Sequence, residues 1–156
     1  MKTTETSGVR LGQFRKVQKS SLLAGVVLFV LGILGFIPGA TAQYGSMAFA
    51  GHGSEAMLLG VFQVSVLHNL IHLLPGVAGV VMSRRPLPAR NFLIGAGVGY
   101  LLLWTLGQFL AQDSPVNVLP VNSADNWLHL VLGMGLIVFG VAFSRDAPAK
   151  VRESRA

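Results

Sequence analysis

Apolar residues gather in four stretches of the chain that contain no Asp, Glu, Lys or Arg. These stretches span 20–38, 56–83, 91–112 and 126–144. A helix needs about 20 consecutive apolar residues to cross the roughly 30 Å hydrocarbon core of a bilayer. Strands of a membrane barrel would instead alternate apolar and polar residues in short segments, and these stretches are continuous. The pattern therefore predicts an all-α integral membrane protein, a bundle of four transmembrane helices.

The second stretch is longer than one crossing needs. Counting about twenty residues back from Arg84, at 1.5 Å per residue, places the outer end of this crossing near residue 65. Residues 56–64 are then expected to form an interfacial segment or an extra outer turn. The predicted organisation is a basic tail over 1–19, a four-helix domain over 20–144 with crossings at about 20–38, 65–83, 91–112 and 126–144, and a basic tail over 145–156.

Lys and Arg are confined to three parts of the chain: the tail before residue 20, the loop 83–90 and the tail after residue 144. The other two connections, 39–55 and 113–125, contain none of the twelve Lys and Arg residues of the chain. Cytoplasmic loops carry an excess of Lys and Arg, and four crossings place both termini and the middle loop on one side. We therefore predict a multi-pass plasma-membrane protein with both termini in the cytoplasm.

Composition supports this class. The chain is 52% hydrophobic and 12% charged, whereas soluble domains have about 25% charged residues. The net charge of +6 reflects the sorted basic residues, and Phe14 is the single aromatic residue among them, unlike the interleaved aromatics of a nucleic-acid-binding surface. We expect the lipid bilayer as a partner and no nucleic acid. The basic start and Ala40-Thr41-Ala42 imitate a secretory signal, but the apolar stretch exceeds the usual 7–15 residues, so we expect this helix to be retained.

An internal repeat relates the second and fourth stretches. HNLIHLLPGVAG at 68–79 aligns without gaps on DNWLHLVLGMGL at 125–136. The alignment pairs Asn69 with Asn126, His72 with His129, and Gly76 with Gly133; the preceding stretches share the spacing of Gly25 and Leu34-Gly35 with Gly97 and Leu106-Gly107. We predict two helical hairpins of parallel topology, related by an axis along the membrane normal. Such an axis brings the two polar motifs together near the outer face.

Three segments of the chain resemble a known family. FQVSVLHNLIHLLPGVAG at 62–79, GFIPG at 35–39 and SADNWLHLVLG at 123–133 are similar to the uncharacterised bacterial four-helix membrane proteins grouped as domain of unknown function 4383. The resemblance runs from the first to the fourth stretch and leaves the basic tails outside. It implies the four-helix fold and assigns no activity.

Six polar residues are expected to form one cluster in the outer leaflet. His68 and His72 are four residues apart and share a helix face, and polar residues within membrane spans face the bundle interior. The predicted cluster comprises His68, Asn69, His72, Asp125, Asn126 and His129. Hydrogen bonds between membrane helices contribute about 0.6 kcal/mol on average. The cluster therefore favours a structural, accessory or partner-binding role, with Asp125 or Ser123 capping the last helix.

Three alternative roles use the same residues. His68, His72 and His129 could ligate Zn or Cu, with Asp125 as a further ligand or as the acceptor that orients His129. A b-type haem between His72 and His129 is a second alternative. Transport or proton relay is a third, since histidine titrates near neutrality, but no continuous polar route crosses the predicted bundle. The sequence does not select one cofactor, and a protein without any cofactor is one of the alternatives.

Other features bear on partners and catalysis. Gly95 and Gly99 form a G-x-x-x-G motif of the kind that lets membrane helices approach closely, which suits a homo-oligomer or a membrane-protein partner. Pro75 lies within the second predicted helix, where it frees the carbonyl of Ile71. We find no nucleophile paired with a base, no phosphate-binding glycine loop and no paired catalytic carboxylates. We expect no enzymatic activity.

Overall fold

Four helices make up most of the described chain. The computed structural model describes residues 15–109 and 118–143. The helices are α1 (Lys16–Leu34), α2 (Val66–Met82), α3 (Pro86–Phe109) and α4 (Ser123–Ala142). Of these, α1, α3 and α4 are long and apolar enough to cross a membrane, and α2 is an apolar helix of 17 residues. The predicted all-α, four-helix membrane fold is confirmed. Most of the predicted basic tails lies outside the described residues.

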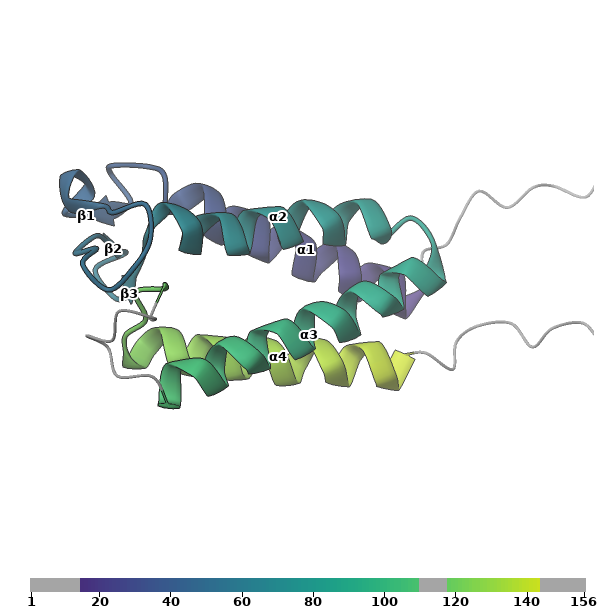
Figure 1. The fold of residues 1–156 in the computed structure, drawn as a ribbon. Coiled ribbons are helices and arrows are strands. Elements are labelled where there is room, and N and C mark those ends of the chain that lie inside the picture. Colours follow the sequence, from purple (N-terminus) through teal and green to yellow (C-terminus); the bar gives the residue numbers. More distant parts are fainter. Residues whose placement is uncertain (1–14, 110–117, 144–156) are drawn as a thin grey trace, which may run out of the picture.

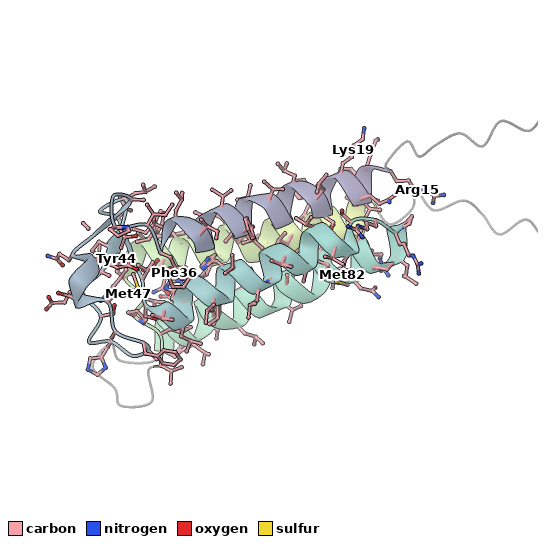
Figure 2. All side chains as sticks on the ribbon, turned by 90° about the horizontal axis from the view of Figure 1, so that it is seen from above. Arg15, Lys19, Phe36, Tyr44, Met47 and Met82 are labelled. Carbon is pink, nitrogen blue, oxygen red and sulfur yellow. The ribbon has the colours of Figure 1, made fainter. Side chains whose placement is uncertain are left out.

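The helices are arranged as two hairpins lying side by side (Figure 1). α1 packs mainly along α2, and α3 packs mainly along α4, while α2 and α3 contact each other much less. The two ends of the bundle differ in chemistry. Arg15 and Lys19 lie at the end where α2 turns into α3, and Tyr44 and Met47 lie at the opposite end (Figure 2). The described basic residues and the non-basic connection 39–55 are therefore at opposite ends of the bundle.

Three helices begin before the charge-free stretches that predicted them. α1 begins at Lys16 and ends at Leu34, four residues early at each end, α3 begins at Pro86, and α4 begins at Ser123. The criterion of a charge-free stretch excluded Lys and Arg, but their long side chains extend to the headgroups from within a helix. A proline also suits the first turn of a helix, because its missing N–H has no intrahelical partner there.

Residues 56–64 lie outside α2, as the count from Arg84 predicted, and supply two strands of a small sheet. Strands β1 (Thr41–Ala42), β2 (Met57–Leu58) and β3 (Phe62–Gln63) pair antiparallel in the order β1-β2-β3. A short 3₁₀-helix, η1 (Tyr44–Ser46), follows β1. Ala56, Leu58 and Val64 are buried against Leu31 and Leu34 of α1. The sheet is thus held against the non-basic end of α1.

Glycines bring the helices of each hairpin into close contact at corresponding positions. A Cβ added at Gly25 of α1 would lie 2.6 Å from the backbone nitrogen of Val80 in α2. In the second hairpin, a Cβ added at Gly97 of α3 would lie 2.7 Å from Cγ1 of Ile137 in α4. The alignment that pairs the two polar motifs also pairs Val80 with Ile137, so both hairpins pack through equivalent contacts.

Polar side chains join α1 to α2 near the basic end. The Gln18 side-chain amide donates to the carbonyl of Ser83 at 2.9 Å, and the Ser21 hydroxyl donates to the carbonyl of Gly79 at 2.9 Å. All four residues are buried. Such bonds satisfy polar groups that have no water partner inside a bilayer.

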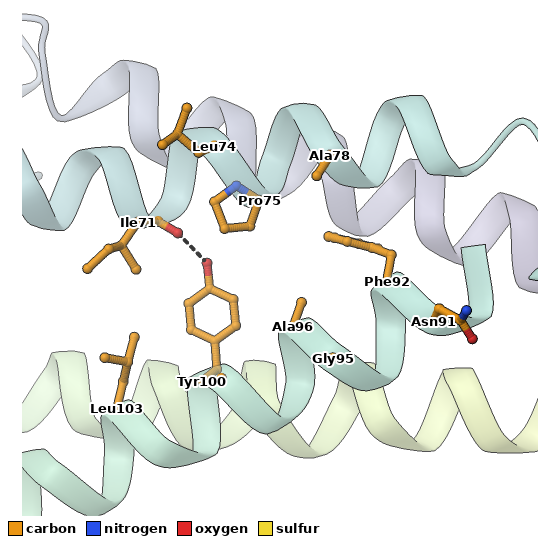
Figure 3. A pocket seen from close by; sticks show the side chains of 11 residues that line it. Ile71, Leu74, Pro75, Ala78, Asn91, Phe92, Gly95, Ala96, Tyr100 and Leu103 are labelled. Atoms are coloured by element: carbon orange, nitrogen blue, oxygen red, sulfur yellow. Dashed lines mark hydrogen bonds between the residues drawn. The ribbon is translucent and has the colours of Figure 1, made fainter. Parts of the chain in front are cut away.

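Pro75 interrupts the backbone hydrogen bonds of α2, and α3 supplies a substitute donor. Proline has no N–H, so the carbonyl of Ile71 lacks its usual helical partner. The Tyr100 hydroxyl of α3 donates to this carbonyl at 3.2 Å (Figure 3). A donor from the other hairpin therefore satisfies the carbonyl that the sequence predicted to be free.

Because Tyr100 supplies the donor that Pro75 lacks, the effects of mutating these two residues on the free energy of unfolding should be strongly coupled. We expect Tyr100→Phe to lower the free energy of unfolding by about 1–2 kcal/mol, because the Ile71 carbonyl loses its donor in an apolar environment. In a Pro75→Ala background the new N–H can donate to Ile71, so the same change should have an effect close to zero. Unfolding in mixed detergent micelles titrated with SDS measures all four proteins of this cycle. Equal losses in both backgrounds would contradict the assignment.

Candidate functional site

Three histidine side chains meet inside the bundle, near the end that carries the sheet. His68 and His72 come from α2 and His129 from α4, so the cluster joins the two hairpins. The ring centroids lie 5.0 Å apart for His68 and His72, 5.4 Å for His68 and His129, and 5.8 Å for His72 and His129. All three side chains are buried.

Backbone carbonyls fix the orientation of two of these rings. The Nδ1 of His68 lies 2.9 Å from the carbonyl oxygen of Gln63, and the Nδ1 of His72 lies 3.2 Å from that of His68. A carbonyl oxygen only accepts, so Nδ1 of His72 carries the proton. In the neutral ring of His72 the lone pair is then on Nε2. The Pro120 carbonyl also interacts with His68, which makes His68 the most constrained of the three.

The remaining ring nitrogens of His72 and His129 have no such contacts. Nε2 of His72 and both nitrogens of His129 are buried and have no hydrogen-bond partner among the described residues. One nitrogen from each of the three histidines lies within 4.8 Å of the other two. A buried polar group left without a partner costs about 1–3 kcal/mol. The cluster therefore holds converging lone pairs that nothing in the described part of the chain satisfies.

Asp125 links the start of α4 to the first hairpin. Its Oδ2 accepts the backbone N–H of Asn122 at 2.9 Å and that of Gln63, in β3, at 3.0 Å. The Asn122 side chain in turn accepts the N–H of Asp125 at 3.0 Å. This is a capping box with Asn122 as the N-cap. The N-cap is therefore Asn122 and not Ser123, whereas Asp125 takes part in the cap from the first turn of the helix.

A small cavity separates Asp125 from two of the histidines. Its volume is about 10 Å³, and its lining includes His68, His72 and Asp125. This is close to the smallest volume that holds one water molecule. Oδ1 of Asp125 is buried and has no hydrogen-bond partner among the residues that the structure describes. A water or a small ion between these groups would reach both the carboxylate and the imidazoles.

The two asparagines of the predicted cluster pack against glycines. The Asn69 side chain lies against Gly35 of α1, and the Asn126 side chain lies against Gly107 of α3, so closely that a Cβ at either glycine would overlap it. The Asn126 side-chain amide donates to the Gly107 carbonyl at 3.2 Å. The six predicted residues thus divide into a histidine cluster, a neighbouring carboxylate and two asparagines that join the helices within each hairpin.

Tyr100 belongs to this site, although the sequence analysis did not select it. Its ring centroid lies 5.5 Å from that of His72 and 5.8 Å from that of His129. The available signal was a tyrosine in the middle of an apolar helix, since a buried tyrosine hydroxyl usually has a hydrogen-bond partner. The fourth histidine, His52, is exposed in the connection between η1 and β2.

The fold and the site define a class: a small helical membrane protein whose two hairpins share a buried polar centre. A family model described as Domain of unknown function (DUF4383) matches residues 18–142. The chain belongs to this family. The match includes all of the cluster residues and supports the resemblance that the sequence motifs indicated. No curated protein and no solved structure matches the chain.

Proposed function

We propose that this protein binds a transition-metal ion of the zinc or copper type through His68, His72 and His129. The observation that carries this proposal is the convergence of three buried imidazoles from two hairpins, two of which, His72 and His129, have nitrogens that lack hydrogen-bond partners among the described residues. An ion would satisfy these lone pairs together. We propose a binding role, without catalysis, and one that goes beyond the structural role favoured by the sequence.

The surroundings of the rings support this donor set. Histidines that ligate metals usually donate their second N–H to a backbone carbonyl or a carboxylate, which fixes the tautomer. His68 and His72 both have this arrangement through Nδ1. Neutral imidazole suits zinc and copper, and a three-histidine site leaves a fourth position for water. Asp125, across the small cavity from His68 and His72, is suited to accept a hydrogen bond from such a water.

The separation of the nitrogens is compatible with an ion after a modest adjustment. Zinc–nitrogen bonds of about 2.0–2.1 Å in tetrahedral geometry bring the ligating nitrogens to about 3.3 Å from one another. The present nitrogens lie within 4.8 Å of one another. The farthest pair would need to approach by up to roughly 1.5 Å. The ring of His129, whose nitrogens have no hydrogen-bond partner among the described residues, is free to contribute to this approach by rotating on its side chain.

The surroundings favour an ion over haem. A macrocycle held between His72 and His129 would have to extend sideways from the line that joins them. The rings of His68 and Tyr100 lie beside both histidines at 5.0–5.8 Å between centroids. A single ion needs no such space.

The sorted charges suggest the side from which the ion arrives. We propose that the basic end of the bundle faces the cytoplasm of a bacterial plasma membrane, following the rule for Lys and Arg. The histidine cluster then lies near the outer face, under the small sheet. Arg84, Arg85 and Arg90 lie near the opposite end of α2 and α3. We propose binding or sensing of an external ion, with no transport across the membrane.

Metal analysis of the purified protein tests the proposal. The protein is purified in detergent through a tag without histidine, treated with a chelator, and dialysed against zinc or copper in separate samples. We expect about one ion per chain after dialysis and a higher temperature of unfolding for the loaded protein. Metal content no higher than that of a detergent blank, with both ions, would end the proposal. A Soret band in the protein as isolated would instead favour haem.

A further inference from the structure

A groove runs along the outside of the bundle between α2 and α3 (Figure 3). Its volume is about 610 Å³. The lining is mostly apolar and includes Leu74, Pro75, Ala78, Phe92, Gly95 and Gly99. The groove follows the two helices from Ile71 and Leu103 to Asn91, which lies toward the basic end. The groove therefore runs lengthwise along the side of the bundle.

Small residues keep this groove open. A Cβ added at Gly95 or Gly99 would have no neighbour within 4 Å. The predicted G-x-x-x-G motif thus faces the groove and does not pack against the helices described here. The opposite wall contains Pro75. No described segment of the chain covers these glycines, so an external group of elongated, apolar shape fits the groove.

Polar and positively charged residues lie near the basic end of the groove. Asn91 lines the groove, and the turn that joins α2 to α3 carries Arg84 and Arg85, both exposed. The segment 83–109 contains no Asp or Glu. In the orientation proposed above, this end lies at the cytoplasmic leaflet, where anionic lipids gather. An apolar groove whose end lies near a turn with two exposed arginines complements an acyl chain that ends at a phosphate.

We propose that the α2–α3 groove binds an anionic phospholipid of the cytoplasmic leaflet. One acyl chain lies along Gly95 and Gly99, and the headgroup lies at Arg84, Arg85 and Asn91. A lipid chain that moves from bulk lipid into the groove gains no hydrophobic free energy, since both environments are apolar. The preference among lipids must therefore come from the headgroup charge, and the retention of the lipid from the shape of the groove.

A second copy of the chain fits this groove less well. Two copies that docked groove to groove about an axis along the membrane normal would place their α2–α3 turns side by side, as in any two-fold interface. Arg84 and Arg85 of both copies would then repel one another, whereas a phosphate neutralises them. The lipid therefore satisfies both the shape and the charge of the site.

Lipid binding to the full-length protein in detergent, measured by native mass spectrometry, tests this proposal. The probes are phosphatidylglycerol and phosphatidylcholine with identical acyl chains, added to delipidated protein. We expect phosphatidylglycerol to bind roughly 30-fold more tightly, as two nearby arginines would produce. The double variant Arg84→Gln, Arg85→Gln should lose this preference. The variant Gly99→Leu should lose binding of both lipids, because its side chain fills the groove.

Two control proteins separate the groove from its surroundings. The double variant Lys16→Gln, Lys19→Gln removes exposed charges from α1 at the same end, and Gly135→Leu adds a side chain to α4 where nothing lies within 4 Å. Both should bind like the unmodified protein. Equal affinity for the two lipids, or unchanged binding by folded Gly99→Leu, would overturn the proposal. A dimer that forms without lipid and is lost in Gly99→Leu would assign the groove to a second copy instead.

Discussion

Replacement of His129 by leucine is expected to lower the affinity for the metal ion by more than about 100-fold. The loss of an outer hydrogen-bond partner of a metal ligand already lowers affinity about 10–100-fold, and His129 is proposed as a ligand itself. It is also the only one of the three that comes from the second hairpin. Competition with a chelating dye, for zinc and copper separately, measures the change. His72→Leu should show a loss of similar size.

The same variant gives a second result that distinguishes metal binding from a purely structural role. Neither nitrogen of His129 has a partner among the described residues, so leucine removes no hydrogen bond that the structure shows there. In metal-free samples we expect His129→Leu to be at least as stable as the unmodified protein, because an unsatisfied buried polar group is replaced by an apolar one. His52→Leu, at an exposed position, serves as the control and should keep its metal. A less stable His129→Leu together with a metal-free native protein would indicate a structural role for the histidines.

The sequence predicted the number of helices, their approximate positions and the bounds of α2 to within one residue, and it missed ends of α1, α3 and α4. Continuous apolar stretches determine where a chain can cross a bilayer, because every backbone group inside must be satisfied within a helix. Lys16 and Pro86 nevertheless lie inside the first turns of α1 and α3. The ends depend on local caps and on side chains that extend to the headgroups, and these do not follow from hydrophobicity alone.

The site was only partly visible in the sequence. The alignment of 68–79 with 125–136 pairs His72 with His129, and the structure brings these two rings to 5.8 Å. The carbonyl of Gln63 that orients His68 could not be predicted, because residues 56–64 were expected as an interfacial segment or helical turn and form strands. A contact made by a backbone atom leaves no residue type for a sequence pattern to detect.

The alignment also pairs His68 with Asp125, and the two positions have acquired different contacts. His68 lies in the histidine cluster, while Asp125 accepts two backbone N–H groups, one of them from the first hairpin. Both side chains line the same small cavity. Equivalent positions in the two hairpins thus supply an imidazole on one side and a carboxylate on the other. An ion with a bound water would use both, the imidazole as a ligand and the carboxylate as the acceptor of a hydrogen bond from the water. Two histidines or two carboxylates at these positions would not supply both functions.

Two substitutions of Asp125 separate its role in the fold from its proposed role beside the ion. We expect Asp125→Leu to lower the free energy of unfolding by about 3 kcal/mol or more, since the N–H groups of Asn122 and Gln63 lose their acceptor and each such loss costs about 1–3 kcal/mol. Asp125→Asn retains an oxygen that can accept both N–H groups. It should therefore unfold within about 1 kcal/mol of the unmodified protein. Titration with SDS measures these differences.

For Asp125→Asn, we expect a large change in metal affinity despite the small change in stability. Asp125→Asn keeps the contacts of the fold and removes the carboxylate charge beside the cavity, so we expect its affinity for the ion to fall about 10–100-fold, the usual range for an outer partner of a metal site. A serine in place of Asn122 preserves a cap at the start of α4 and does not change the cavity lining, so Asn122→Ser is the matched control and should bind the ion normally. Unchanged affinity in Asp125→Asn would restrict Asp125 to holding α4 against β3, because the loss of its charge would then have no effect on the histidine cluster.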